Sequence, residues 1–208
     1  QLKPIARFTA DPTVLVVRAD SPWKTLPEFI AAVRSKPGAY SFGSSGNYGT
    51  MHLPMEMLKS EARLHLLHVP YTGAAPAVMA LLSDQVTALS TGPASVAQHV
   101  KAGKLRVLAH WGTEPLAAFP GVPSLKEAGH PVEFAQWSGL FVPADTPEPV
   151  IAKLREAARF AASDPLVRQT MTTAGSPLQY LDTPEFQAYI AADAKKLKEA
   201  VHKIGKVE

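Results

Sequence analysis

The sequence predicts an α/β fold in which short strands alternate with helices around a largely parallel sheet. Between residues 13 and 109, short runs rich in β-branched residues alternate with segments of helical apolar periodicity. Such alternation is typical of strand–helix–strand units, whose strands pair in parallel. Most of the 19 prolines fall where one of these segments begins or ends, which supports the same division.

The first strand and helix carry the clearest signals. Residues 13–18 (TVLVVR) are predicted to form a strand, and Thr25 with Glu28 forms a capping box that begins a helix. The apolar stripe of this helix is Leu26, Phe29, Ile30 and Val33. A strand at residues 40–43 follows, and the Gly/Ser/Asn loop of residues 43–50 leads into the next helix.

The same pattern continues to residue 109. We expect strands at residues 64–69, 86–89 and 105–109, and helices at residues 73–83 and 95–102. Gly103 follows the second of these helices, at the position where a left-handed residue commonly ends a helix.

The last third of the chain is predicted to be helical. Thr146, Asp164 and Thr183 each precede a proline, which places an N-cap residue before a proline in the first turn. Gly175 ends the second of these helices. The expected apolar stripes are Val150, Leu154, Ala157, Ala158 and Ala161 in the first helix, and Phe186, Ile190, Leu197, Val201 and Ile204 in the last. We interpret Lys195, Lys196, Lys198 and Lys203 as a solvated face that suits the helix dipole.

The composition excludes several classes of function. A formal net charge of +3, spread along 208 residues, is too weak to indicate a nucleic-acid partner. No apolar run approaches the roughly 18 residues of a spanning helix. The absence of cysteine excludes a thiol nucleophile, a disulfide framework and cysteine-ligated metal, but leaves the compartment open.

The most informative segment is residues 43–50 (GSSGNYGT), which follows a strand and leads into a helix. Ligands of α/β sheets bind beyond the carboxyl ends of the strands. Backbone N–H groups at the helix start, with the hydroxyls of Ser44, Ser45 and Thr50, would form an anion cradle. No lysine stands in the loop, which argues against a phosphate-binding P-loop. A plain strand–helix turn stays open as the alternative.

A second strand–helix junction, residues 69–73 (VPYTG), places Tyr71 and Thr72 on the same rim of the sheet. Two such junctions side by side predict a pocket wall. A buried tyrosine with a satisfied hydroxyl is the alternative.

The same residues give little support to an enzyme. A nucleophile elbow needs G-x-S-x-G, and Asn47 stands at the fifth position. His52 follows the serines without an evident orienting carboxylate, and we interpret it as a polar side chain at a pocket rim or helix cap. His65 and His68 would face opposite sides of a strand, which excludes a metal pair. We therefore expect no catalytic residue, no metal and no cofactor.

At these residues the sequence resembles the substrate-binding receptors of tripartite tricarboxylate transporters, the Bug family. The matching segments run along nearly the whole chain. They are residues 41–46 (SFGSSG), 68–73 (HVPYTG), 101–106 (KAGKLR), 119–124 (FPGVPS) and 137–143 (WSGLFVP). Their order and spacing together make the resemblance specific.

The resemblance implies a type II, periplasmic-binding-protein-like bilobal clamshell with an incomplete first lobe. It assigns residues 13–133 to lobe two, and residues 1–12 and 134–208 to the remainder of lobe one. It implies a periplasmic receptor, not an enzyme, that binds a small carboxylate or related amide and works with the membrane components of a tripartite transporter. The residues it assigns to the ligand are Ser44, Ser45, Asn47, Tyr48, Thr50, His52, Tyr71, Thr72, Gly73 and, on a neighbouring junction, Thr91.

Two other functions stay open: a ligand-sensing domain of a transcriptional regulator, which uses a similar bilobal architecture, and a serine hydrolase that uses Ser44 or Ser45. We also expect the chain to self-associate. An incomplete first lobe would leave the apolar stripes of the C-terminal helices without cover.

Overall fold

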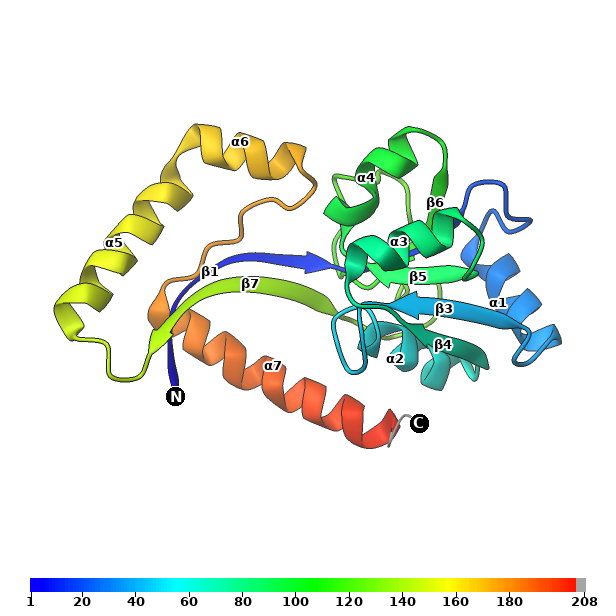
Figure 1. Cartoon of the computed structure of the whole chain (residues 1–208), viewed down its shortest axis with the longest axis horizontal. Helices are drawn as coiled ribbons and strands as arrows, with labels where there is room; N and C mark the ends of the chain where they lie inside the picture. Colours follow the sequence, from blue (N-terminus) through cyan, green and yellow to red (C-terminus); the bar gives the residue numbers. More distant parts are fainter. Residues whose placement is uncertain (205–208) are drawn as a thin grey trace. The chain divides into compact units, whose positions relative to one another are not determined.

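The computed structural model describes residues 1–204, and the chain divides into two compact units. Unit 1 contains Gln1–Asp11 and Gln136–Glu199, and unit 2 contains Pro12–Ala135 together with the residues from Ala200 on. Unit 1 has a two-stranded sheet and unit 2 a five-stranded sheet (Figure 1). The chain is therefore a mixed α/β protein, as the sequence predicts.

The sheet of unit 2 has the strand order β4-β3-β5-β2-β6. Its strands are β2 (Val14–Arg18), β3 (Tyr40–Ser44), β4 (Leu66–Pro70), β5 (Ala88–Thr91) and β6 (Leu105–His110). β3 pairs in parallel with β4 and β5, whereas β2 is antiparallel to β5 and β6. Four strands therefore point their carboxyl ends to one edge of the sheet.

The antiparallel β2 departs from the parallel arrangement that the alternation of elements predicts. One residue separates it from β1 (Leu2–Pro12), so no helical crossover precedes β2 and the rule for strand–helix–strand units does not govern its direction. β5 also starts two residues later than the predicted strand at residues 86–89. Val86 is buried like a strand residue but lies before the strand.

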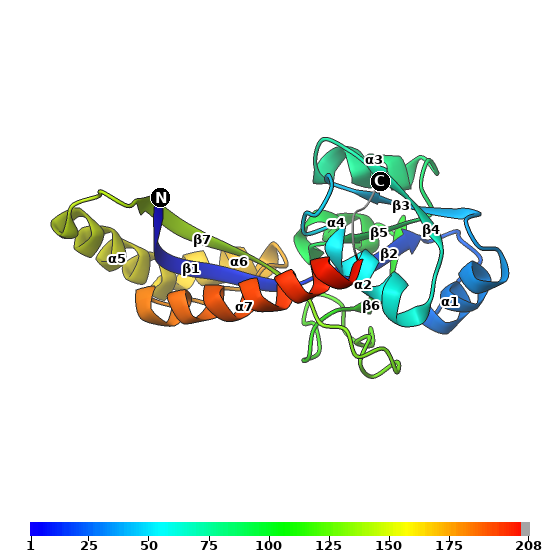
Figure 2. The same cartoon turned by 90° about the horizontal axis from the view of Figure 1, so that it is seen from below.

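Helices cover both faces of this sheet. α3 (Ala74–Leu82) and α4 (Pro93–Lys101) pack on one face, where Leu81 and Val96 join Val16, Leu89 and Val107 in one apolar cluster. α1 (Leu26–Ser35) and α2 (Leu53–Ala62) lie on the other side (Figure 2). The predicted capping box of α1 is present, and its four predicted stripe residues are all buried.

Unit 1 contains the helices α5 (Glu148–Ser163) and α6 (Pro165–Thr173) and most of β1, of β7 (Ala135–Pro143) and of α7 (Thr183–Ile204). Ile5, Val142 and Ile151 form its small core with Ala6 and Ala158. From α7, the fully buried Phe186 packs beneath Gly139 of β7.

A carboxylate fixes the segment before α7 to α5. Arg155 donates from Nε and Nη2 to the two oxygens of Asp182, both at 2.9 Å, and Arg159 donates to Oδ2 at 2.7 Å. The backbone N–H of Thr183 donates to Oδ1 at 2.8 Å. The Arg155 guanidinium, foremost among these partners, holds the pKa of Asp182 well below its ordinary value.

Two expectations about the C-terminal helices are wrong in detail. Thr146 does not cap α5: the N-cap is Pro147, and the helix uses Pro149 in its first turn. Either proline suits a first turn, which needs no N–H, so the sequence leaves the start ambiguous by one residue. Of the predicted stripe, Ala158 is buried but Val150 is exposed, and Ile151 and Ala162, which the prediction omitted, are buried. By contrast, Asp164 caps α6 as predicted, accepting from two backbone N–H groups.

Of the stripe predicted for α7, only Phe186 is buried within the described residues. Ile190, Leu197, Val201 and Ile204 are half-buried. None of the helices in residues 1–204 combines the length and the apolar character needed to cross a lipid bilayer.

Candidate functional site

The carboxyl edge of the unit 2 sheet carries most of the predicted ligand residues. β3 ends at Ser44, β4 at Pro70 and β5 at Thr91. The loop after β3, residues 45–52, is joined to the loop after β4, because the Tyr71 N–H donates to the Ser44 carbonyl at 2.9 Å. The two strand–helix junctions are therefore neighbours, as the sequence predicts.

The candidates differ in their access to solvent. Asn47, Tyr48, Thr50 and Thr72 are exposed; Ser45, Tyr71 and Gly73 are half-buried; Ser44, His52 and Thr91 are buried. Only the first two groups present atoms that an incoming molecule could reach in this conformation.

The predicted anion cradle at the start of α2 is wrong for two of its amides. The N–H groups of His52 and Leu53 both donate to the Gly49 carbonyl at 3.0 Å, in a turn that closes before the helix begins. The helix starts at Leu53, so this turn occupies two of the N–H groups at the helix start and leaves them unavailable to an anion.

Ser44 holds the loop from beneath. Its hydroxyl lies 2.6 Å from Nε2 of His68, accepts from the Gly46 N–H at 3.2 Å and donates to the Gly46 carbonyl at 3.0 Å. The contact carries no signal in the sequence, because it joins residues 24 positions apart on two different strands. Parallel pairing of β3 with β4 sets Phe42 opposite His68 and so brings His68 near Ser44.

His52 occupies the N-cap position of α2, as one of the two interpretations has it, but its side chain makes no capping hydrogen bond. The side chain is fully buried, so the interpretation as a pocket-rim residue is wrong. Its Nδ1 accepts from the Tyr48 N–H at 2.9 Å, and its Nε2 lies 3.6 Å from Oε1 of Glu56. The ring stacks on His68 with the centroids 4.0 Å apart, and the Phe42 ring stacks against both. The sequence distance between the two histidines hides this pair.

Burial sets the charge state of this cluster. It lowers the pKa of the His68 imidazole to about 4, with the charges of His52 and Lys59 acting in the same direction. Burial raises the pKa of Glu56, but its partners His52 and Lys59 bring the pKa below its ordinary value. Lys59 Nζ lies 2.6 Å from Oε1 of that carboxylate. At neutral pH the cluster holds a neutral His68 and an ion pair.

Thr91 lies deeper than a rim residue. Val14 of β2 pairs with Thr91 of β5 on one side and with His110 of β6 on the other. Among the described residues, the Thr91 hydroxyl has no hydrogen-bond partner, and neither has the buried hydroxyl of Thr13.

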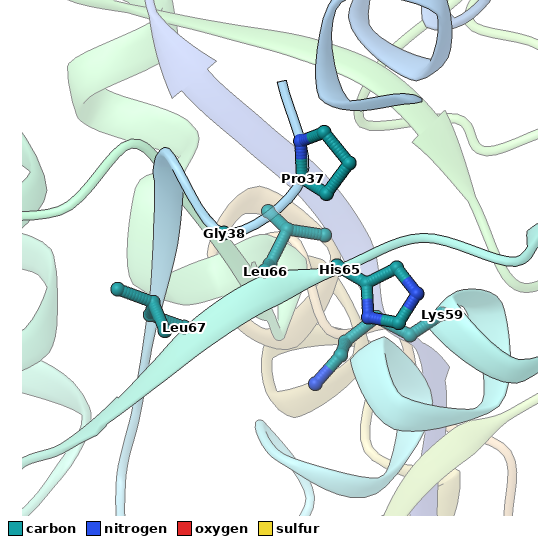
Figure 3. Close-up of a pocket in the computed structure, with 6 residues that line it drawn as sticks. All are labelled: Pro37, Gly38, Lys59, His65, Leu66 and Leu67. Atoms are coloured by element: carbon teal, nitrogen blue, oxygen red, sulfur yellow. The ribbon is translucent and has the colours of Figure 1, made fainter. Parts of the chain in front are cut away.

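A separate surface pocket of about 320 Å³ lies beside the edge strand β4 (Figure 3). It is lined by Pro37, Gly38, Lys59, His65, Leu66 and Leu67, and so by none of the ten predicted ligand residues. Its one permanent charge, Lys59, is already paired with Glu56. The pocket therefore does not alter the choice of site. In the part of the chain that the structure describes, no three His, Asp or Glu side chains gather in a way that could hold a metal ion.

Comparison with known proteins identifies related sequences and structures. The family model of the tripartite tricarboxylate transporter family receptors (TctC) matches residues 1–206. A UPF0065 protein of Cupriavidus necator, encoded in the gbd 5′ region, is 36% identical over 191 residues, which cover 92% of this chain and 58% of that protein. The chain thus spans little more than half the length of this curated relative.

Two solved structures extend the comparison. A TctC solute-binding protein from Polaromonas is 31% identical and superposes with a TM-score of 0.78. The matched region covers 97% of this chain and 69% of the Polaromonas chain. MatC from Rhodopseudomonas palustris, solved with bound malate, is 28% identical and gives a TM-score of 0.83. The matched region covers 98% of this chain and 68% of the MatC chain.

Proposed function

Because the chain belongs to the tripartite tricarboxylate transporter receptor family, we propose that it is part of a periplasmic solute receptor for a small carboxylate or related amide. The observation that carries the proposal is the pair of joined loops at the carboxyl edge of unit 2, which present neutral hydrogen-bond donors. MatC, which is 28% identical, holds malate. Since the chain spans 58% of a curated relative, the ligand and partners of the whole receptor are part of the proposal.

The accessible donors suit a carboxylate. Asn47, Thr50 and Thr72 are exposed and offer an amide and two hydroxyls, and neither loop contains lysine or arginine. Hydrogen bonds from neutral donors to an ionised carboxylate are stronger than those between neutral groups. We assign direct contact to these exposed residues with Ser45 and Tyr71, and a supporting role to the buried Ser44 and His52.

Titration calorimetry with a panel of mono- and dicarboxylates, their amides, sugars and cationic amines tests the proposal. We expect heat of binding only with carboxylates or amides, malate being the first to try. If sugars or amines are the only ligands found, the proposed function is wrong.

Replacing Thr50 by alanine is expected to weaken carboxylate binding by about 1–3 kcal/mol, the cost of leaving a charged group short of a hydrogen bond. The measurement is the dissociation constant of the tightest ligand in the panel. Lys198→Ala is the control, because Lys198 is exposed on α7 and belongs to neither loop. Equal losses from the two variants would point to a different site.

The Ser44–His68 contact does not favour a hydrolase. A nucleophile must reach its substrate, and Ser44 is fully buried with its hydroxyl bound at Gly46. We propose instead that the receptor delivers its ligand to the membrane components of a tripartite transporter.

We further propose that the chain self-associates through an apolar surface at the α5–α6 junction, formed by Phe160, Leu166 and Val167. The first two side chains are 73% and 71% exposed. Apolar groups gathered on a surface favour association, because pairing removes them from water. A two-fold dimer is the simplest closed arrangement.

Light scattering coupled to size exclusion is expected to give a dimer at tens of micromolar, and Phe160→Glu with Leu166→Lys to give a monomer. Leu67→Lys serves as the control, since Leu67 is 60% exposed on β4 in unit 2. A monomeric unmodified chain at that concentration would contradict the proposed dimer.

A further inference from the structure

We propose that Gly43 is a positioning residue for Tyr71. The missing side chain at position 43 leaves a slot, bounded by Gly43, Val86 and Leu89, that holds the Tyr71 ring and so sets the place of its hydroxyl. The packing concerns unit 2 alone. The effect on ligand binding rests on the proposed function, in which Tyr71 contacts the ligand.

Three side chains surround the space where a Cβ of residue 43 would lie. That atom would be 2.7 Å from Cδ2 of Leu89, 3.3 Å from Cε2 of Tyr71 and 3.3 Å from Cγ2 of Val86. Nonbonded carbon atoms pack best about 3.5–4.0 Å apart, so even a methyl group is too large for the slot. Gly43 is not one of the glycines with a positive φ, so the position requires glycine for its size and not for its backbone conformation.

The register of the sheet brings these groups to one face. Gly43 lies in β3 between Val69 of β4 and Leu89 of β5. Successive residues of a strand face opposite sides, so the ring of Phe42 stacks against the two buried histidines, whereas Gly43 faces the apolar cluster that α3 and α4 cover. The half-buried Tyr71 packs against that same cluster.

Tyr71 is held by its backbone and by packing. Its N–H donates to the Ser44 carbonyl at 2.9 Å, which fixes the start of the side chain. Within residues 1–204 its hydroxyl makes no hydrogen bond, so packing sets the direction of the ring. Cε2 is bonded to the carbon that carries the hydroxyl, so the close approach to Gly43 lies at the polar end of the ring.

The three neighbours of the slot differ in their freedom to move. Val86 and Leu89 are 1% and 0% exposed and belong to the apolar cluster, whereas Tyr71 is half-buried. Because a close-packed interior resists displacement, a methyl group at position 43 would force the Tyr71 ring toward solvent. The hydroxyl would then leave the place from which it donates to a ligand.

A measurement on the unsubstituted, ligand-free chain tests the slot directly. One Hα of Gly43 points in the direction of the missing Cβ, so nuclear Overhauser effects from that proton to the ring protons of Tyr71 are expected. Absence of these effects would overturn the proposal, and this measurement needs no variant to fold.

Gly43→Ala is expected to shift the ring resonances of Tyr71 and to leave those of Tyr180, in unit 1, unchanged. The variant should also lose stability, because its methyl group meets Leu89 in the core. Leu89→Val removes Cδ2, so adding it to Gly43→Ala should restore most of the denaturation midpoint while the Tyr71 resonances stay displaced. A return of those resonances together with the midpoint would show that Gly43 serves the core and not the ring.

Malate is the probe for the effect on binding. In Gly43→Ala with Leu89→Val, its dissociation constant is expected to rise at least about tenfold, the cost of losing one hydrogen bond to a charged group. Leu89→Val alone is the matched control and should bind malate as the unsubstituted chain does. Tyr71→Phe should raise the dissociation constant by a similar factor, because it lacks the same hydroxyl.

The losses from Gly43→Ala and Tyr71→Phe should not add. If Gly43 acts through the Tyr71 hydroxyl, Gly43→Ala with Leu89→Val weakens binding little further in a Tyr71→Phe background. Additive losses would contradict the positioning role. Failure of the unsubstituted chain to bind any carboxylate would contradict the proposed function alone, since the position of the ring is measured without ligand.

Discussion

Replacing Gly139 by alanine is expected to destabilise unit 1 by about 3 kcal/mol or more. A Cβ at this position would lie 2.5 and 2.7 Å from two ring carbons of Phe186 and 2.9 Å from the carbonyl oxygen of Ala6. The ring is fully buried and the carbonyl belongs to β1, so neither can move away without disturbing the packing of α7 or the two-stranded sheet.

Chemical denaturation followed by circular dichroism measures this loss, and exchange of the amides in α7 locates it. Gly73→Ala is the control: its Cβ would find nothing nearer than Cδ of Pro76, at 3.9 Å. Adding Phe186→Leu to Gly139→Ala should recover part of the loss, because the smaller side chain vacates the space near the new Cβ. Unaltered unfolding of Gly139→Ala would show that the close approach of α7 to β7 is not required.

Replacing Phe42 by alanine is expected to cost about 3–5 kcal/mol in unit 2, the usual cost of truncating a fully buried phenylalanine. The ring stacks on His68 at 4.9 Å and on His52 at 6.0 Å, and Lys59 Nζ lies 5.2 Å from its centroid. The cavity left by the ring would sit beside two polar rings and a charge, so water entering it would loosen the histidine pair.

The chain offers a control in Met79→Ala, which truncates an apolar side chain of α3 in the same unit that is 60% exposed and should change the stability by no more than about 0.5 kcal/mol. Phe42→Leu should lose less than Phe42→Ala, since most of the volume is kept. Denaturation midpoints give all three values. Equal losses for Phe42→Ala and Met79→Ala would refute the role given to the buried ring.

The elements that sequence analysis predicted correctly carry local signals. The capping box of Thr25 and Glu28, the N-cap at Asp164 and the left-handed Gly103 each depend on residues within one turn of a helix. The direction of β2 has no such signal, because it depends on which strands lie beside it. The start of α5 was missed by one residue because two prolines compete for the same turn.

The predictions for the candidate site also separate into those that follow from a general rule and those that depend on the tertiary structure. That the loops after β3 and β4 are neighbours follows from a general property of parallel strands. That Ser44 and His52 are buried could not be read from their positions, since polar residues in a Gly-rich loop are usually exposed. The contact between Ser44 and His68 joins residues on different strands, so it emerges only once the register of β3 and β4 is known.

The antiparallel β2 also bears on how unit 2 reaches its folded state. β2 comes first of the five strands in the chain, yet it lies between the two that come last, with Val14 beside Thr91 and His110. Its pairing therefore closes long stretches of chain, which raises contact order and slows folding. Until β6 is available, the apolar Val14–Arg18 segment has an unpaired edge. A chain with this topology keeps β2 unpaired until late in folding, which exposes the folding chain to aggregation through this strand.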